Sequence, residues 1–201
     1  MSPSSLEGPV SRYLNRPLSR PLAGWLARTP LTPNQVSAFS FLLALGVLGL
    51  FAWGAHIAAG VLIQATSVAD GVDGDLARLK GMATRFGAAF DAIVDRYADA
   101  AIVGGMAWWA WQHEDWPQPL LLGLVTLVGF LMVSYSRARL EVIDRGALLS
   151  VPSLASRDVR LLLAAIGSVA GQVYWTMAVL AGLSFLLVAW RLAWMWARQR
   201  A

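Results

Sequence analysis

The chain contains no cysteine and has few charged residues. Only 14% of its 201 residues are charged, whereas 57% are hydrophobic. The absence of cysteine excludes a disulfide framework and thiol chemistry. The shortage of charge excludes an ordinary soluble domain and is typical of a polytopic membrane protein.

The chain also lacks the order of a signal peptide, because its first long apolar run begins only after about 35 residues rich in arginine and proline. Within residues 5–28, apolar side chains recur at nearly helical spacing between arginines, with Pro17 and Pro21 interrupting the pattern. We therefore predict that residues 1–34 form a cytoplasmic interfacial segment that is amphipathic. A disordered basic arm is the alternative.

Apolar runs of membrane-crossing length fill the rest of the chain. A helix of about 20 residues crosses a bilayer, and six such spans leave little room for anything else in a chain of this length. We predict an all-α polytopic membrane protein with six transmembrane helices in one domain, residues 35–201. The predicted spans are 35–53, 56–79, 85–111, 117–141, 157–171 and 173–196, and the weak turn signal at Gly171 makes the last boundary the least certain.

The basic residues are confined to alternate ends of these spans. They occur before the first span, between spans two and three, between spans four and five, and at the C-terminal end, which includes Arg191; Arg96 lies inside span three toward the same side. The turns at 53–56 and 112–119 and around Gly171 contain none. By the positive-inside rule, both termini lie on the cytoplasmic side of the inner or plasma membrane. Topology thus accounts for the net charge of +4, and we expect no nucleic-acid partner.

Four aspartates stand out in this apolar chain. Asp70 and Asp73 share one helix face, as do Asp91 and Asp95. Both pairs fall at the cytoplasmic ends of adjacent antiparallel spans, so the four carboxylates can converge. A carboxylate in a bilayer costs several kcal/mol, which a cation offsets. Oxygen ligands alone suit Mg²⁺ or Mn²⁺, and four carboxylates suit two metal ions per site. Structural salt bridges to Arg78, Arg85 and Arg96 are the alternative.

Glycines and one arginine accompany these aspartates. Gly71, Gly74 and Gly87 lack side chains, so a phosphate or nucleotide can approach the backbone; close helix packing is the alternative. Arg78 is spaced to pair with a phosphate or to clamp a carboxylate.

The pattern Asp-x2-Asp-Gly-x2-Ala-Arg-x8-Gly-x3-Asp-x3-Asp resembles the signature of the CDP-alcohol phosphotransferase family. The eight fixed positions are Asp70, Asp73, Gly74, Ala77, Arg78, Gly87, Asp91 and Asp95. Residues 32–34, Thr-Pro-Asn, resemble a segment that these enzymes carry near the nucleotide. The six-span layout is also this family's architecture, so the resemblance extends over nearly the whole chain.

The resemblance implies an enzyme in which an alcohol attacks the β-phosphate of a CDP-linked donor and CMP leaves. It implies that Asp70, Asp73 and Asp91 hold the metal ions. It further implies that Asp95 completes the second metal site and acts as general base toward the acceptor hydroxyl. The residues implied to contact the CDP moiety are Gly74, Ala77, Arg78 and Gly87, together with Thr32 and Asn34.

The substrates are less sharply defined. Residues 91–99 and 156–160 look most similar to the inositol-phosphate branch of the family. We therefore expect CDP-diacylglycerol or CDP-inositol as donor and inositol phosphate as acceptor, with glycerol 3-phosphate or another polar alcohol as the alternative. A homodimer is expected. The candidate ligands of the acceptor phosphate are four arginines toward the end of span four and the start of span five: Arg137, Arg139, Arg157 and Arg160. At least half of these arginines are expected to serve only the positive-inside rule.

Two other classes of protein also carry intramembrane aspartates. Prenyltransferases bind pyrophosphate through Mg²⁺, but they lack the Gly-x2-Ala-Arg insert between their acid pairs. A cation transporter could use the carboxylates as its path. The predicted acids, however, lie near one membrane face, and no second matching motif occurs.

Overall fold

The computed structural model describes residues 8–143 and 156–198, and all the regular structure within those ranges is helical. The elements are a π-helical turn, η2 (Ser11–Asn15), followed by α1 (Arg16–Leu26), α2 (Pro33–Ala52), α3 (His56–Leu79), α4 (Arg85–His113), α5 (Pro119–Ile143), α7 (Arg157–Val169) and α8 (Val173–Arg198). The prediction of an all-α chain is confirmed.

The six predicted spans correspond to α2, α3, α4, α5, α7 and α8, with ends that differ by two residues or fewer. The turn between α7 and α8 lies where it was predicted, with Gly171 at φ +67°. Three of the helices, α2, α5 and α8, are long and apolar enough to cross a membrane. The count of six spans stays a prediction, because α3 and α4 carry the acidic residues and α7 has only 13 residues.

The turns without basic residues meet at one end of the molecule. The His56 ring nitrogen Nδ1 lies 2.8 Å from the Ser168 carbonyl oxygen, and Trp109 donates a hydrogen bond to the Gly54 carbonyl. The Glu114 carboxylate accepts hydrogen bonds from the first two backbone N–H groups of α8, which have no partner within the helix. Helices that end here therefore alternate with helices that begin here, as the distribution of charge predicted.

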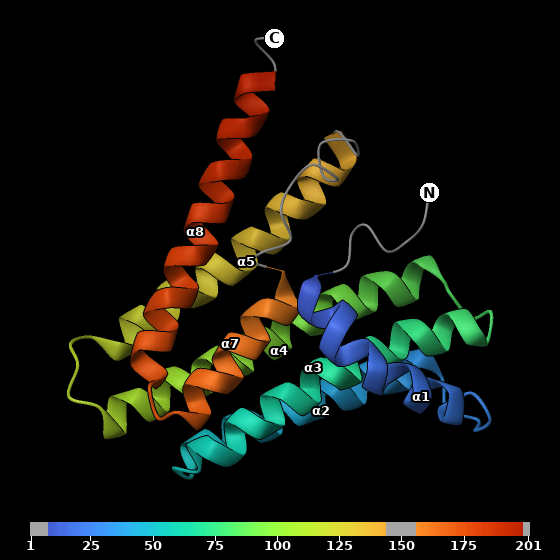
Figure 1. Ribbon diagram of the computed structural model, residues 1–201, viewed down its shortest axis with the longest axis horizontal. Coiled ribbons are helices and arrows are strands. Elements are labelled where there is room, and N and C mark those ends of the chain that lie inside the picture. Colours follow the sequence, from blue (N-terminus) through green and yellow to red (C-terminus); the bar gives the residue numbers. More distant parts are fainter. Residues whose placement is uncertain (1–7, 144–155, 199–201) are drawn as a thin grey trace.

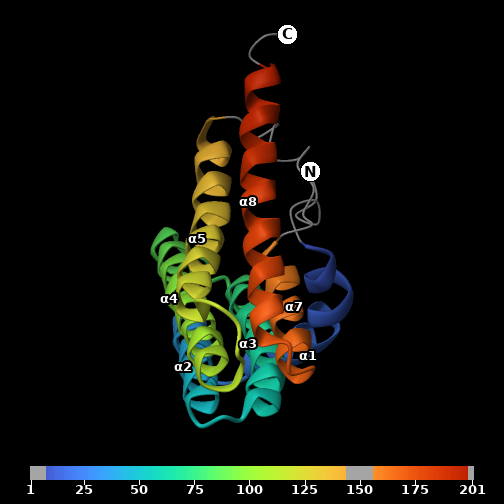
Figure 2. The ribbon, with the colours of Figure 1, turned by 90° about the vertical axis from the view of Figure 1, so that its left-hand side faces the viewer.

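Two groups of helices diverge from this end. In Figure 1, α2, α3 and α4 extend to one side, whereas α5 and α8 rise together away from them. Figure 2 shows α5 and α8 side by side, with α7 between α8 and α3. The buried core that joins the two groups includes Phe51, Ile63, Ile102, Met106, Leu161 and Met177. A pocket lined by residues of α4, α5, α7 and α8 lies between the two groups.

The N-terminal segment is helical throughout residues 9–26, and we call it the N-terminal helix. The prediction that Pro17 and Pro21 interrupt it is wrong. Pro17 falls at the start of α1, where a missing N–H is tolerated, and the π-helical turn before it alters the local hydrogen bonding. Apolar side chains are exposed along this helix, among them Tyr13, Leu18 and Trp25. Its interfacial location stays a prediction.

Close packing of α3 on α7 depends on Gly60. A Cβ at this position would lie 2.8 Å from the Ala165 carbonyl oxygen and 3.0 Å from the Val169 backbone nitrogen. Those atoms belong to the backbone and cannot rotate away. Gly182 in α8 provides a matched control, because a Cβ there meets nothing within 4 Å.

We predict that Gly60→Ala destabilises the chain by about 1–3 kcal/mol through overpacking. Gly182→Ala should be neutral or stabilising by about 0.4–1 kcal/mol, because alanine has less freedom in the unfolded chain. Thermal unfolding of both variants in one detergent measures the difference. Equal stability of the two variants would contradict the packing described here.

Candidate active site

Three carboxylates converge where α3 faces α4. One carboxylate oxygen each from Asp70, Asp91 and Asp95 lies within 4.8 Å of the others. These oxygens fit a hard divalent cation such as Mg²⁺ or Mn²⁺, and mutual repulsion gives them a reason to bind one. Asp73 stands beside this group rather than in it, and its carboxylate accepts a hydrogen bond from Ser37 of α2. The sequence predicted that four carboxylates converge. In the structure three of them converge, and the fourth, that of Asp73, lies next to them.

The short connection between α3 and α4 places these carboxylates. Gly81 adopts φ +65°, a left-handed conformation that favours glycine, and lets the chain reverse. Thr84 then caps α4 by accepting a hydrogen bond from the Gly87 N–H at 2.9 Å. Lys80 donates to the carbonyls of Thr29 and Leu31, which ties the connection to the segment before α2.

A pocket of about 220 Å³ opens on one side of the carboxylates, among α2, α3 and α4. Five of the six residues predicted to contact the CDP moiety line it: Asn34, Gly74, Ala77, Arg78 and Gly87. We call it the α2–α4 pocket. The sixth, Thr32, is not a lining residue. It caps α2 in a reciprocal pair of hydrogen bonds with Gln35, so it positions Asn34 from outside.

Glycine at position 87 keeps the α2–α4 pocket open. A Cβ there would lie 3.2 Å from Asn34 Oδ1 and 3.1 Å from Thr84 Oγ1. Arg78 clamps a carboxylate, since its guanidinium lies 2.6 Å from Asp75, and it also lines the pocket, where its pairing with a phosphate stays a prediction. Asp75 also pairs with Arg16 of α1. Gly71 is different, since it faces Ser19 of α1 and serves helix packing.

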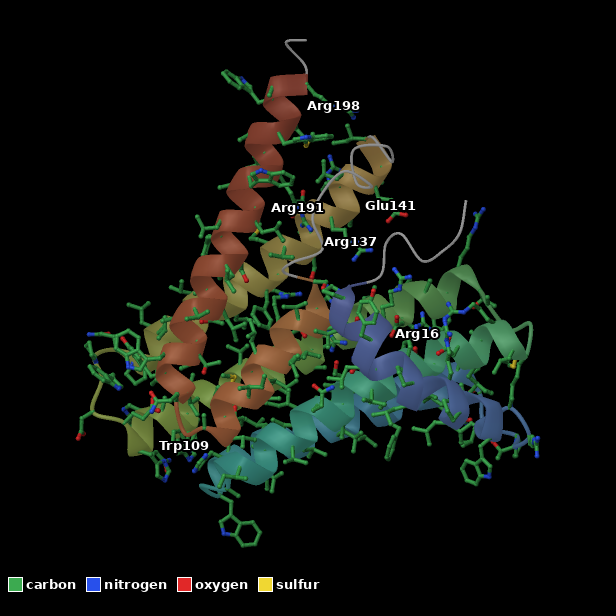
Figure 3. The ribbon with its side chains drawn as sticks, viewed as in Figure 1. Arg16, Trp109, Arg137, Glu141, Arg191 and Arg198 are labelled. Carbon is green, nitrogen blue, oxygen red and sulfur yellow. The ribbon has the colours of Figure 1, made fainter. Side chains whose placement is uncertain are left out.

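A second pocket, of about 280 Å³, opens on the other side of the carboxylates, where α5 and α8 diverge from α4. We call it the arginine pocket. Three of the four arginines predicted to bind the acceptor line it, namely Arg137, Arg157 and Arg160. Arg139 does not line it and is exposed on α5. Figure 3 shows Arg137 and Arg191 close together on the facing sides of α5 and α8.

Arg157 joins the arginine pocket to the carboxylates. Its guanidinium lies 2.6 Å from Asp70, 3.0 Å from Asp95 and 3.0 Å from Asp99. The Asp99 side chain is fully buried, and Arg157 provides the partner that a buried carboxylate requires. The alternative of structural salt bridges is therefore realised in part: Arg96, which that alternative named, lies 3.3 Å from Asp95, and Arg157, which the sequence had assigned to the acceptor, pairs with Asp70 and Asp95.

Arg160 is a buried cation without a carboxylate within salt-bridge distance among the described residues. It is only 2% exposed and stacks over the Phe130 ring at 4.1 Å. Within the described chain, its Nε and Nη1 atoms have no hydrogen-bond partner. A buried guanidinium with unfilled donors is costly unless an anion binds it. Arg160 lines the arginine pocket, so an anion that entered this pocket could reach it.

Sequence reasoning missed Arg191. This residue of α8 is 6% exposed, lines the arginine pocket, and donates hydrogen bonds to the Val133 carbonyl and the Ser136 hydroxyl of α5. It had been counted among the arginines that fix topology. Its position inside an apolar helix was the available signal, because an intramembrane charge points to function. Arg96, also counted as a topology residue, lines the same pocket.

The carboxylates of the four aspartates lie between the two pockets. Asp73 and Asp91 line the α2–α4 pocket, whereas Asp70 and Asp95 line the arginine pocket. Two ligands can therefore approach the same carboxylates from different sides. This arrangement suits a transfer reaction between two substrates.

Residues 30–197 match the family model described as CDP-alcohol phosphatidyltransferase. The chain belongs to this family. A bifunctional IPC transferase and DIPP synthase of Rubrobacter xylanophilus is 43% identical over 173 residues, which are 84% of this chain and 38% of that protein. A phosphatidylinositol phosphate synthase of Mycolicibacterium smegmatis is 36% identical over 152 residues, 75% of this chain and 67% of that protein. The chain thus spans well under half of the Rubrobacter relative.

Solved structures of a phosphatidylinositol phosphate synthase from Mycobacterium tuberculosis share the fold. The structure with CDP-DAG bound has a TM-score of 0.73 at 29% identity and covers 88% of this chain and 92% of the other. A second, in complex with manganese and citrate, has a TM-score of 0.74 at 28% identity, with 89% of each chain covered.

We predict that Asp91→Asn weakens Mn²⁺ binding by roughly tenfold or more, because it removes one of three convergent ligands. Asp115→Asn is the matched control, since it removes the same charge from an exposed site in the turn after α4. Titration of each variant with Mn²⁺, followed by electron paramagnetic resonance, gives the affinities. If Asp91→Asn binds Mn²⁺ as tightly as Asp115→Asn, the assignment of the metal site is wrong.

Proposed function

We propose that this protein is an integral membrane transferase that moves a substituted phosphate from a CDP-linked donor to a polar alcohol, with release of CMP. The observation that carries the proposal is the group of aspartate carboxylates that lies between two pockets, one with glycines in its lining and the other rich in arginine. Family membership supports the reaction class. The donor is CDP-diacylglycerol or CDP-inositol, and the acceptor is inositol phosphate, with glycerol 3-phosphate as the alternative.

The α2–α4 pocket suits the CDP moiety. Gly74 and Gly87 leave the backbone accessible, and Asn34 and Arg78 supply polar contacts for the base and the phosphates. The mycobacterial structure with CDP-DAG bound, whose fold this chain shares, supports a CDP-linked donor. Both donors carry this moiety, so the pocket does not choose between them.

The arginine pocket suits the acceptor. Arg160 and Arg191 present buried donors without partners in the described chain, and Arg137 lies beside them. A phosphorylated alcohol needs several such donors to offset its desolvation. Relatives named phosphatidylinositol phosphate synthase and archaetidylinositol phosphate synthase support an inositol phosphate acceptor.

The chemistry follows from these positions. The acceptor oxygen bonds to the β-phosphorus of the donor, the bond from that phosphorus to the bridging oxygen breaks, and CMP leaves with the oxygen. Asp95 lines the acceptor side and takes the hydroxyl proton. Mg²⁺ or Mn²⁺, held by Asp70, Asp91 and Asp95 with Asp73 adjacent, neutralises the diphosphate.

The membrane arrangement forms part of the proposal. We propose six membrane-crossing helices, an N-terminal helix on the cytoplasmic surface, and both termini and the active site on that side. The meeting of the turns that lack basic residues at one end supports this orientation. The homodimer and the absence of a nucleic-acid partner stay predictions.

The role of Asp95 can be separated from donor binding. We predict that Asp95→Asn lowers turnover by roughly 10²–10⁴-fold, because a general base acts in the chemical step, while affinity for the CDP donor largely survives. CMP release and equilibrium binding of the donor measure the two properties. Turnover near that of the wild type would place the base elsewhere.

Arg137 and Arg139 provide a matched pair on α5. We predict that Arg137→Ala raises the acceptor KM by roughly tenfold, the loss expected for one charged hydrogen bond. Arg139→Ala should leave the acceptor KM unchanged, because the side chain is exposed outside the pocket. The donor KM should change in neither variant. An equal effect of both substitutions would mean that surface charge, rather than the arginine pocket, attracts the acceptor.

A further inference from the structure

The first turn of α7 carries three charged side chains that point to three different partners. Arg157 reaches the aspartates and Arg160 reaches Phe130 and the arginine pocket. Asp158, between them in the sequence, reaches the N-terminal helix instead: its carboxylate accepts a hydrogen bond from the backbone N–H of Ser11 at 2.5 Å. This contact joins residues 147 positions apart in the chain.

The contact between Asp158 and the N-terminal helix is close. A Cβ on Gly8 would lie 2.1 Å from Asp158 Oδ1 and 2.3 Å from Ser156 Oγ, so a side chain at this position would displace the carboxylate. The first N–H groups of a helix lack partners within it and carry a partial positive charge. A carboxylate therefore suits this end of the N-terminal helix both as acceptor and as counter-charge.

The middle of the N-terminal helix is fixed to α3. Asn15 donates to the Ser67 hydroxyl and accepts from Gln64, each at 2.9 Å. Arg16, the next residue, and Ser19, one helical turn after Asn15, both contact Asp75. The N-terminal helix thus connects α3, which carries Asp70, to the first turn of α7. It therefore restrains the position of Arg157 and Arg160 relative to α3.

The contacts of the N-terminal helix restrain α7 independently of the ion pairs that Arg157 makes. Those ion pairs use Asp70 and Asp95, which are also assigned to the divalent cation, so the cation and the guanidinium share the same carboxylates. Asp158 itself is neither one of the convergent carboxylates nor a residue that lines the arginine pocket. At its other end, α7 is fixed to α3 by the packing at Gly60.

We propose that Asp158 is a positioning residue for the acceptor: through its contact with Ser11 and Gly8, the N-terminal helix holds the first turn of α7 so that Arg157 and Arg160 meet the acceptor phosphate. This inference rests on the proposed function, because it assumes that these arginines bind the acceptor. It assigns the N-terminal helix a part in acceptor affinity besides any contact with the membrane surface.

Two variants on opposite sides of the contact test the proposal in the full-length chain. Asp158→Asn removes the charge from α7, and Gly8→Ala displaces the carboxylate without changing α7. Each should weaken binding of inositol 1-phosphate, measured by calorimetry with Mn²⁺ present, by roughly fivefold, the scale of a charge at a helix terminus. Donor binding should not change. Combining the two should add little, because both break one contact.

Asp115→Asn serves as the charge-matched control and Arg160→Ala as the control for the acceptor site. If Arg160→Ala weakens binding of inositol 1-phosphate and Asp158→Asn behaves like Asp115→Asn, the inference is overturned while the proposed function stands. If Arg160→Ala has no effect on that binding, the acceptor assignment fails and the inference fails with it. Equal losses of donor and acceptor affinity with a lower melting temperature would reduce Asp158 to a purely structural role and also overturn the inference.

Discussion

The repulsion among Asp70, Asp91 and Asp95 is the constraint on which the rest of the site depends. Three carboxylates within 4.8 Å of one another, in a chain with 57% hydrophobic residues, require cations nearby. Arg157 neutralises part of this negative charge, and the carboxylate oxygens suit a divalent metal ion that would neutralise the rest. The short connection after α3, the cap at Thr84 and the buried pair of Arg157 with Asp99 all keep the carboxylates together despite their repulsion.

The divergence of the helices turns this cluster into a site with two sides. Because α5 and α8 separate from α2, α3 and α4, the carboxylates are reached from the α2–α4 pocket and from the arginine pocket (Figures 1 and 2). Glycines keep the first pocket open, whereas buried guanidinium groups make the second attractive to an anion. A donor in one pocket and an acceptor in the other can therefore both approach the same carboxylates. The fold supplies proximity, and the charges supply selectivity between the two sides.

Local patterns in the sequence predicted the helices and the carboxylates well, because helical periodicity and charge distribution are properties of neighbouring residues. The spacing of Asp91 and Asp95 predicted their shared face, and the turn at Gly171 lay where a weak signal had placed it. Contacts between distant segments were not predictable in this way. Arg191 resembled other topology arginines until α8 was seen to pack on α5. Likewise, Thr32 caps a helix instead of lining the pocket, and Pro17 sits within a continuous helix, because hydrogen bonding around each residue decides its role.

The central claim is that one cluster of carboxylates joins a CDP-linked donor to a phosphorylated alcohol. The most direct measurement is CMP release by the purified chain with Mn²⁺, using CDP-diacylglycerol or CDP-inositol against inositol 1-phosphate, glycerol 3-phosphate, serine and inositol. The account predicts CMP release that requires both a donor and a phosphorylated acceptor, with inositol 1-phosphate the best. CMP release with free inositol or serine as the better acceptor would contradict the role given to the arginine pocket, and no CMP release from any pair would contradict the account as a whole.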